Sequence, residues 1–548
     1  MDARLNKLLG ALPVNRVLNT AHTVRTLAGT GIVRLERPDT VLRTGVALAR
    51  WGPTPAAGYT ASAIRMPDAV ALHDETGELS FRQVHERSNA IARGLAANGV
   101  KEGDAVGILC RNHRGFILAT VACSKLGAHA LYLNTAFAGP QITDVCEREK
   151  PIALIYDQEF SELCADAAKH RKVFVAWYDD DDGQLDGHTL DELCSQNSSD
   201  DVKPPSERGR VVILTSGTTG TPKGASRKQP DTLDPAAALF SKIPLKAREQ
   251  TVIAAPMFHS WGFAHFTLGL ALSSTLIVRR KFDPEHTLED VSGHGASALA
   301  VVPVMLSRIM ELGEQKLGEY DLSSLRVIAA SGSALPGELA TKVMDAFGDV
   351  LYNLYGSTEV AWATIATPAD LRAAPGTAGR PPRGTVVKLY DTDGQEVPAG
   401  ETGRIFVANE MLFEGYAGGG KKDLIDGLMS TGDVGHFDEA GRLFVAGRDD
   451  DMIVSGGENV FPREVEDLLS GHEAIDEAAV IGIDDEKFGQ RLKAFVVVRQ
   501  GAQLSEEDVK AHVKGHLARY KVPREVVLLD ELPRNATGKV LKRELREQ

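Results

Sequence analysis

The sequence has few of the features that mark secreted, membrane-spanning or metal-binding proteins. Its 548 residues include only 5 cysteines, and an odd number of cysteines does not suggest a disulfide framework. No two of them stand at a metal-ligand spacing; they are Cys110, Cys123, Cys146, Cys164 and Cys194. The N-terminus has no uninterrupted apolar core of the signal-peptide type, and no run approaches the roughly 18 apolar residues of a membrane span. We therefore expect a protein of the reducing cytoplasm.

Positive charge is also scarce, and the formal net charge of −14 argues against nucleic acid as the main partner. The first fifty residues are the exception, with eight Lys or Arg against three Asp or Glu. Leucines recur there at helical spacing, with basic residues between them: Leu5, Leu8, Leu9 and Leu12, with Arg4 and Lys7. This pattern is typical of a helix that lies on an anionic membrane surface, and equally of a helix that packs on its own protein. We expect residues 1–60 to form an extension, and the sequence leaves both alternatives open.

From about residue 61 the chain alternates between strand-like and helix-like segments, and no internal repeat is evident. One predicted helix follows Leu79 and runs to about Asn98. The predicted strands are Ala69–Leu72, Ala105–Leu109, Ile152–Tyr156, Val173–Val175, Val211–Leu214, Val252–Ala255, Thr275–Val278, Ala298–Val302 and Arg326–Ala330. This alternation predicts largely parallel sheets covered by helices. Past Gly384 the pattern favours shorter strands, such as Gly403–Val407.

The most informative segment is Leu214–Gly224, where several hydroxyls, three spaced glycines and a lysine follow an apolar strand. Glycines let a backbone turn and approach a ligand closely, while hydroxyls, free N–H groups and a lysine bind phosphate oxygens. The segment is not a P-loop, because Pro222 precedes Lys223 and Gly224 follows it. We therefore expect a loop of another kind that wraps a polyphosphate.

Four further blocks follow in order. They are Asn353–Glu359, Ser430–Asp433, Gly447–Glu466 and Pro533–Val540. Glu359 is a hard oxygen ligand suited to Mg²⁺, and the carboxylate of Asp433 suits a pair of vicinal hydroxyl donors. No Gly-x-Ser-x-Gly elbow accompanies these blocks, so nothing indicates a serine hydrolase.

Taken together, the five blocks resemble those of the adenylate-forming superfamily, which comprises acyl-CoA synthetases, peptide-synthetase adenylation domains and luciferases. The resemblance covers roughly residues 60–545 and is closest to the fatty-acid CoA ligases. It implies an α/β (mixed α+β) fold with a large N-terminal domain of helix-covered sheets, a β-rich subdomain and a small mobile C-terminal α+β domain. The expected parts are the basic extension at 1–60, the large domain at 61–447, a hinge at 448–451 and the small domain at 452–548.

The resemblance also assigns a nucleotide site. The residues that it implies bind ATP or AMP are Thr215, Ser216, Gly217, Thr218, Thr219, Gly220, Lys223, Ser331, Gly332, Ser333, Asn353, Tyr355, Gly356, Ser357, Thr358, Asp433, Arg448 and Lys539. Among them, Lys223 holds the β- and γ-phosphates, and Lys539 bridges the attacking carboxylate and the α-phosphate. Glu359 holds Mg²⁺, with Thr215 as a weaker candidate. Asp433 accepts bonds from the ribose hydroxyls.

The acyl and thiol sides are implied less directly. The expected tunnel residues are His259, Trp261, Gly262, Ser455, Gly456, Gly457 and Glu458. Asp450 is the expected hinge, about which the small domain rotates so that Ser455–Glu458 approaches the thiol acceptor. As a general base, His259 is a weak candidate, since a histidine at a strand end more often packs on aromatics.

These residues predict an ATP-dependent acyl-CoA synthetase that joins a medium- or long-chain fatty acid to CoA through an acyl-AMP. A fatty acyl-AMP ligase and an aryl-acid CoA ligase are the alternatives within the superfamily, and a catalytically idle lipid-binding protein is the alternative from another class. The expected partners are the acid, ATP and CoA, with peripheral membrane contact through the basic N-terminus. The sequence leaves a homodimer open.

Overall fold

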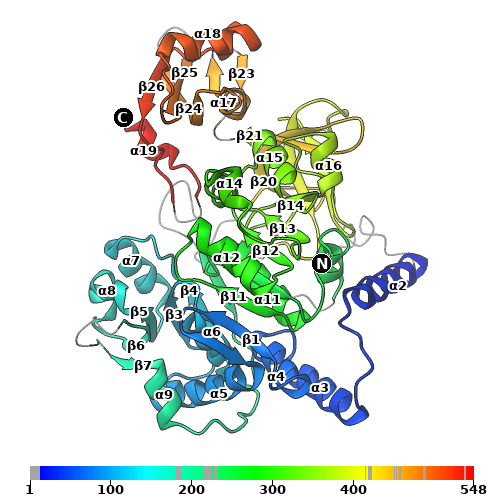
Figure 1. The fold of residues 1–548 in the computed structure, drawn as a ribbon, viewed down its shortest axis with the longest axis vertical. Helices are drawn as coiled ribbons and strands as arrows, with labels where there is room; N and C mark the ends of the chain where they lie inside the picture. Colours follow the sequence, from blue (N-terminus) through cyan, green and yellow to red (C-terminus); the bar gives the residue numbers. More distant parts are fainter. Residues whose placement is uncertain are drawn as a thin grey trace.

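The computed structural model describes residues 13–179, 185, 187–214, 224–226, 233–413, 415–416, 422–449, 451, 453–455, 458–485, 489–535 and 538–547. Figure 1 shows the C-terminal residues as a separate lobe at one end of the molecule. Within the described residues, two eight-stranded sheets form the body, a five-stranded sheet lies beside them, and a second five-stranded sheet forms the lobe. The predicted fold class is therefore confirmed.

The first eight-stranded sheet is parallel except at its two edges. Its strands in spatial order are β15 (Thr364–Ala366), β14 (Leu351–Tyr355), β13 (Val327–Ala330), β12 (Ala298–Val301), β10 (Gln250–Ile253), β11 (Thr275–Val278), β1 (Val70–Asp74) and β2 (Gly77–Ser80). Several carboxyl ends of its parallel strands reach the same edge, which is where ligands bind in open α/β sheets.

The second eight-stranded sheet is parallel from β8 to β7 and has two antiparallel strands at one edge. In order these are β18 (Gly415–Tyr416), β9 (Gly224–Ser226), β8 (Val211–Leu214), β4 (His129–Tyr132), β3 (Ala105–Leu109), β5 (Ala153–Asp157), β6 (Lys172–Trp177) and β7 (His188–Thr189). β8 is followed by the antiparallel strand β9, whereas a P-loop would lead into a helix. The sequence argument against a P-loop is thus confirmed.

The two smaller sheets contain mostly antiparallel pairs. The prediction of shorter strands past Gly384 is wrong for β20, β24 and β25, which have 10, 11 and 10 residues because they form long hairpin pairs. One holds β16 (Val386–Tyr390), β17 (Gly403–Ala408), β20 (Leu428–Phe437), β19 (Leu424–Ile425) and β21 (Leu443–Arg448). The other, in the C-terminal lobe, holds β23 (Glu458–Val460), β22 (Ile453–Ser455), β25 (Gly489–Val498), β24 (Ile475–Asp485) and β26 (Glu525–Leu529).

Helices cover the sheets and also form the start of the described chain. They are α2 (Pro13–Thr30), α3 (Pro38–Trp51), α4 (Pro55–Arg65), α5 (Phe81–Ala97), α6 (Arg114–Leu126), α7 (Gly139–Glu149), α8 (Ser161–Ala168), α9 (Leu190–Gln196), α10 (Asp234–Phe240), α11 (Ser260–Leu272), α12 (Pro284–His294), α13 (Pro303–Met310), α14 (Gly313–Leu317), α15 (Gly337–Phe347), α16 (Pro368–Ala373), α17 (Pro462–Ser470), α18 (Glu506–His516) and α19 (Lys542–Arg546). None of the helices in the described ranges is long and apolar enough to cross a membrane. The stretch around Leu5–Leu12 lies outside these ranges.

One hydrophobic core joins the two large sheets. It contains Leu72 and Val106 from the two sheets together with Phe116 of α6 and Phe266 of α11, each almost fully buried. Ser80 starts α5 with a capping box that includes Gln83, which explains why the predicted helix after Leu79 begins where it does. The sheets therefore act as one body, against which the site is built.

A buried ion pair ties the two sheets together. Asp74, at the end of β1, accepts hydrogen bonds from the backbone N–H of Arg114 at 2.9 Å and from its Nε at 2.9 Å. The Asp74 side chain is fully buried, whereas 16% of the Arg114 side chain is exposed. Burial raises the pKa of Asp74, but the hydrogen bonds and charge of Arg114 outweigh it, so the pKa lies below its usual value.

We expect Asp74→Asn to cost about 3 kcal/mol of stability at neutral pH, because it leaves the Arg114 guanidinium without its buried partner. The contribution of the carboxylate is fully present above its unfolded pKa of about 3.9 and is lost as the pH falls through the lower folded value. Denaturant unfolding of both proteins across this pH range measures the difference, which should shrink in acid. Asp68→Asn, which removes an exposed pair with Arg82, should change stability by less than about 1 kcal/mol; equal losses in the two variants would contradict the assignment.

Candidate active site

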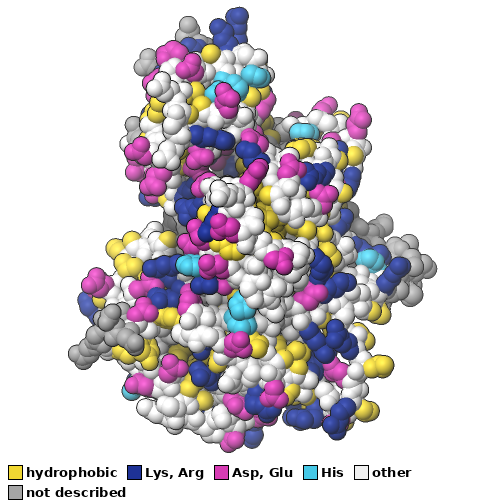
Figure 2. Space-filling model, in the orientation of Figure 1, with side chains coloured by type: hydrophobic (Ala, Val, Ile, Leu, Met, Phe, Trp, Pro, Cys, Tyr) yellow, Lys and Arg dark blue, Asp and Glu magenta, His cyan; other side chains and the backbone are white. Residues whose placement is uncertain are grey.

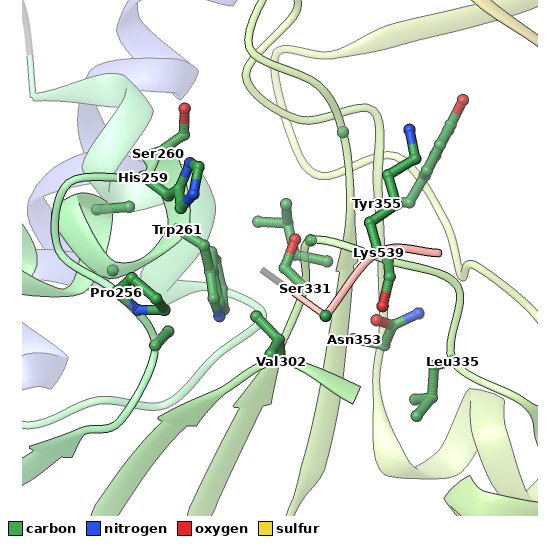
Figure 3. Close-up of a pocket in the computed structure, with 18 of the residues that line it drawn as sticks. Pro256, His259, Ser260, Trp261, Val302, Ser331, Leu335, Asn353, Tyr355 and Lys539 are labelled. Carbon is green, nitrogen blue, oxygen red and sulfur yellow. The ribbon is translucent and has the colours of Figure 1, made fainter. Parts of the chain in front are cut away.

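One large cavity brings together predicted site residues from distant parts of the chain. Its volume is about 3490 Å³, well above the roughly 300–1,000 Å³ of a single small-molecule pocket. The predicted residues that line it are His259, Trp261, Gly262, Ser331, Gly332, Ser333, Asn353, Tyr355, Gly356, Ser357, Thr358, Glu359, Asp433, Arg448 and Lys539. Figure 3 shows several of them, with His259 and Trp261 on one side and Tyr355 and Lys539 on the other.

Other predicted residues are not brought together there. Thr215–Lys223, Asp450, Gly456 and Gly457 lie outside the described residues. Ser455 and Glu458 are paired across β22 and β23 in the C-terminal lobe. Leu214 and Gly224, which flank the predicted phosphate loop, are paired in register, so the loop leaves and rejoins the sheet at one point.

Asp433 lines the predicted nucleotide side of the cavity. The register of β20 and β21 sets Asp433 opposite Arg448, and their nearest atoms, Oδ1 and Nη1, are 3.6 Å apart. The hydroxyl of Tyr355, at the end of β14, donates to Oδ2 of Asp433 at 2.5 Å. Three strands of two sheets thus fix one carboxylate.

The charges around Asp433 oppose the effect of its burial. Burial raises the pKa of Asp433, while the Tyr355 hydrogen bond and the positive charges of Arg448, Lys539 and Lys422 hold that rise back. Burial and the adjacent carboxylate raise the pKa of Tyr355 well above its usual value. The phenol therefore stays protonated and remains a donor.

Lys422 is a site residue that the sequence analysis missed. A Cβ on Gly432 would lie 3.3 Å from Nζ of Lys422 and 3.2 Å from Nη2 of Arg448, so two cations pack over the turn that precedes Asp433. The only sequence signal was the run of glycines and lysines at 418–422. Such a run reads as a loop, although two cations beside a predicted nucleotide site suit phosphate binding.

Lys539 reaches the cavity on a tight turn of the C-terminal lobe. Gly538 has φ +75°, and a Cβ there would lie 2.2 Å from Cγ1 of Val304 on α13, so the close approach requires glycine. The backbone N–H of Lys539 donates to Oδ1 of Asn535 at 2.9 Å, which holds the turn. The exposed Lys539 side chain lies alongside Tyr355 (Figure 3).

The contact between the lobe and the body also contains like charges. Burial and the negative charges of Asp476 and Glu477 on β24 raise the pKa of Glu311, which follows α13, while the positive charge of Arg308 lowers it. Glu477 itself pairs with Arg534 at 2.6 Å. Repulsion between these acids therefore opposes docking of the lobe at this point.

The predicted acyl side of the cavity is closely packed around Trp261 and Gly262. The indole N–H of Trp261 lies 3.0 Å from the carbonyl oxygen of Val301 and 3.3 Å from that of Ala329, which holds the ring against the ends of β12 and β13. A Cβ on Gly262 would lie 2.3 Å from the carbonyl oxygen of Pro256. Only glycine therefore fits at this position in the first turn of α11.

His259 is poorly suited to act as a base. Burial lowers its pKa to about 4, and its Nε2 has no hydrogen-bond partner within the described residues. A neutral ring that shields the cavity wall fits these facts better than a proton acceptor, as expected from the sequence.

Asn353 and Gly356 also line the predicted nucleotide side of the cavity. Oδ1 of the buried Asn353 has no hydrogen-bond partner in the described part of the chain; a buried unpaired acceptor is costly unless a ligand donates to it. A Cβ on Gly356 would lie 2.2 Å from the carbonyl oxygen of Ala361. The need for glycine at 356, which the resemblance places among the nucleotide-binding residues, thus arises from its own loop.

Glu359 fits the predicted metal site in part. Its half-buried carboxylate lines the cavity, and Mg²⁺ is commonly held by one or two carboxylates together with substrate phosphates and water. The other predicted ligand, Thr215, lies outside the described residues. Mg²⁺ at this carboxylate would neutralise phosphate charge.

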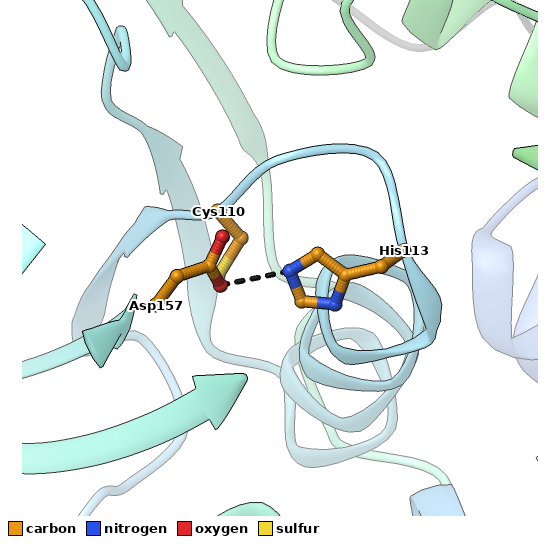
Figure 4. A group of neighbouring side chains, drawn as sticks. All are labelled: Cys110, His113 and Asp157. Atoms are coloured by element: carbon orange, nitrogen blue, oxygen red, sulfur yellow. Dashed lines mark hydrogen bonds and ion pairs between the residues drawn. The ribbon is translucent and has the colours of Figure 1, made fainter. Parts of the chain in front are cut away.

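A second group of chemically active residues, Cys110, His113 and Asp157, is fully buried away from this cavity (Figure 4). Nδ1 of His113 accepts from the N–H of Gly115 at 3.0 Å, so Nε2 carries the proton and lies 2.8 Å from Oδ1 of Asp157. Burial and Asp157 raise the pKa of the Cys110 thiol well above its usual value. Both ring nitrogens of His113 are engaged in hydrogen bonds, which join the ends of β3 and β5.

Comparison with known proteins gives matches along most of the chain. The family model of AMP-binding enzymes matches residues 59–417, and the model of the AMP-binding enzyme C-terminal domain matches residues 464–539. Indoleacetate–CoA ligase of Aromatoleum aromaticum is 32% identical over 491 residues, covering 88% of this chain and 95% of that protein. Feruloyl-CoA synthase of an Amycolatopsis species is 32% identical over 487 residues, covering 88% and 96%.

A solved structure also resembles this chain over most of its length. The o-succinylbenzoate CoA synthetase of Bacillus subtilis, in complex with its acyl-adenylate intermediate, superposes with a TM-score of 0.78 at 26% identity, covering 90% of this chain and 98% of that one.

We expect Tyr355→Phe to lower kcat/KM for ATP about tenfold or more, because a hydrogen bond to a charged group is lost. That hydrogen bond lowers the pKa of Asp433, so its removal should raise this pKa and move the acid limb of the pH profile to higher pH. Pyrophosphate release measured against pH tests both effects. Tyr352→Phe, on the same strand but outside the cavity lining, is the matched control, and an acid limb that stays in place in Tyr355→Phe would count against the role of this bond.

Proposed function

Because the chain belongs to the AMP-binding enzyme family of the adenylate-forming superfamily, we propose that it is an ATP-dependent CoA ligase for an apolar carboxylic acid. The observation that carries this proposal is the presence of Lys539, Asp433 and Arg448 in one cavity with an apolar wall at Trp261. The relatives named above as CoA ligases and CoA synthases support CoA as the acceptor.

In the first half-reaction, a carboxylate oxygen of the acid attacks the α-phosphorus of ATP, and pyrophosphate leaves. Lys539 neutralises charge at the reacting centre, Asp433 holds the ribose, and Lys223 holds the departing phosphates. The unpaired Oδ1 of Asn353 accepts from the amino group of adenine. Positioning and fixed charges of this kind supply most of the rate in phosphoryl chemistry.

In the second half-reaction, the CoA thiol loses its proton and attacks the acyl carbon, and AMP leaves. The predicted hinge at Asp450 lets the small domain, residues 452–548, rotate away with Lys539 and bring Ser455–Glu458 toward the thiol. A domain hinge that separates two steps in this way is a common device. Glu359 holds Mg²⁺ in this proposal.

Two classes of acid are candidates. The names of the relatives, which refer to indoleacetate, ferulate and 2-succinylbenzoate, support an aryl acid, the alternative kept in the sequence analysis. A medium- or long-chain fatty acid is the second candidate, because the cavity that Trp261 lines is also lined by the apolar residues Leu268 of α11, Leu27 of α2 and Ile32. With a fatty acid as substrate, peripheral contact with a membrane through the N-terminal extension becomes part of the proposal.

A panel of acids separates these candidates. We expect the protein to form a CoA ester from an acid, ATP and CoA. The panel compares two aryl acids, indoleacetate and ferulate, with two fatty acids, decanoate and palmitate. The class of acid that gives the highest kcat/KM identifies the substrate. Adenylate without a CoA ester would point to the fatty acyl-AMP ligase. Absence of any acid-dependent pyrophosphate release would contradict the enzyme and favour the lipid-binding alternative.

Lys539→Ala tests the division between the half-reactions. We expect adenylate formation to fall by about a hundredfold or more, because a preorganised cation at the developing charge is lost. Thioester formation from a supplied acyl adenylate should stay near the wild-type rate, since the lysine is absent from that step. Lys514→Ala, on the exposed face of α18, should alter neither rate; an equal loss of both half-reactions in Lys539→Ala would remove this role.

A further inference from the structure

Exposed hydrophobic side chains are concentrated near the start of the described chain. Of the 13 large hydrophobic residues that are exposed among the described residues, seven lie between residues 24 and 48. They are Val24, Val33, Leu35, Val41, Leu42, Val46 and Leu48. Scattered exposed hydrophobics need no explanation, but a group of this size marks an interaction surface.

Helix α3 is buried on one side only. Ala47 and Trp51 pack against Ala56 and Ala57 of α4 in a small core. Val41 and Leu48 are seven residues apart and Leu42 and Val46 four apart, which places them on neighbouring rows of the helix surface. The 70% exposure of Leu42 and the 107% exposure of Leu35, just before the helix, show that nothing in the described structure covers this face.

Arginines border the same face. Arg34, Arg43 and Arg50 are exposed, and no carboxylate of the described residues pairs with them. The nearby acids are already engaged: Glu36 lies 2.7 Å from both Arg65 and Arg248, and Asp39 lies 3.2 Å from Arg37. Figure 2 shows basic and hydrophobic side chains side by side at the edge that α3 occupies in Figure 1.

We propose that this basic apolar surface, formed by Leu35, Leu42 and Val46 with Arg43 and Arg50, docks on an anionic lipid bilayer. An amphipathic helix that lies in the membrane interface needs an apolar face for the acyl region and basic residues for the headgroups, and α3 offers both. The face lies outside the matched family model, which begins at residue 59.

Charge favours a bilayer over a second copy of the chain. In a symmetric dimer through this face, Arg43 and Arg50 of both copies would share one interface, and like charges gathered across an interface are costly. The rest of the protein is acidic, since the whole chain carries −14, so the positive charge is local. Leu27, Ile32 and Leu48 of the same region also line the site cavity, which brings a lipid-facing surface next to the apolar end of the site.

Vesicle sedimentation of the full chain, without ATP, CoA or acid, tests the proposal. We expect wild-type protein to bind phosphatidylglycerol-containing vesicles at least tenfold more tightly than pure phosphatidylcholine vesicles, and less tightly as salt rises. Leu35→Asp/Leu42→Asp and Arg43→Glu/Arg50→Glu should each weaken binding at least tenfold. The matched control Leu163→Asp/Leu528→Asp, which alters exposed leucines elsewhere, should bind as the wild type does.

The proposal would be overturned if wild-type protein bound anionic and neutral vesicles with equal affinity. It would also be overturned if Leu35→Asp/Leu42→Asp bound anionic vesicles as tightly as the wild type. A wild-type dimer in analytical ultracentrifugation that this variant converts to a monomer while vesicles remain unbound would overturn it as well, because the occupant would then be a second copy. CoA-ester formation from a water-soluble acid without vesicles checks that each variant is folded. Because vesicle binding is measured without substrates, its failure is independent of the proposed ligase activity.

Discussion

The candidate site depends on one small contact, the packing of Gly538 against Val304. Asp433, Arg448 and Tyr355 are all fixed by strands of the body, through the register of β20 and β21 and the end of β14. Lys539 comes from the far lobe, and a side chain at position 538 would clash with α13 at 2.2 Å. A bare backbone turn is therefore what allows a charge from one lobe to complete an electrostatic arrangement built by the other.

Much of this arrangement could be predicted from local sequence. Apolar runs bounded by turn residues predicted the parallel strands, for example β3 at Ala105–Leu109 and β11 at Thr275–Val278, because buried strands need continuous apolar side chains. The motif residues that line the cavity could be predicted because the five sequence blocks resemble those of the adenylate-forming superfamily in residue type and order. The roles assigned to Thr215–Lys223 and to Asp450 stay predictions, since those residues lie outside the described chain.

The features that could not be predicted all depend on contacts between distant segments. Lys422 reaches the turn at Gly432 because β19 and β20 pair as a hairpin, and no local pattern marks that contact. The pairing of β3 with β5 brings Asp157 to Cys110 and His113, although the residues are far apart in sequence. The class of acid is equally a property of packed surfaces, since Trp261 is held by carbonyls of two other strands. Sequence motifs specify the chemistry, whereas packing specifies what is bound.

The acids at the contact between the lobe and the body affect the free energy with which the lobe docks. Glu311 faces Asp476 and Glu477, so the contact that brings Lys539 to the cavity is opposed as well as favoured. A contact that combines like charges with the ion pair of Glu477 and Arg534 is sensitive to ionic strength and to substitutions that change its charge. The way in which the lobe presents Lys539 to the cavity therefore depends on charges that lie far from Lys539 in the sequence.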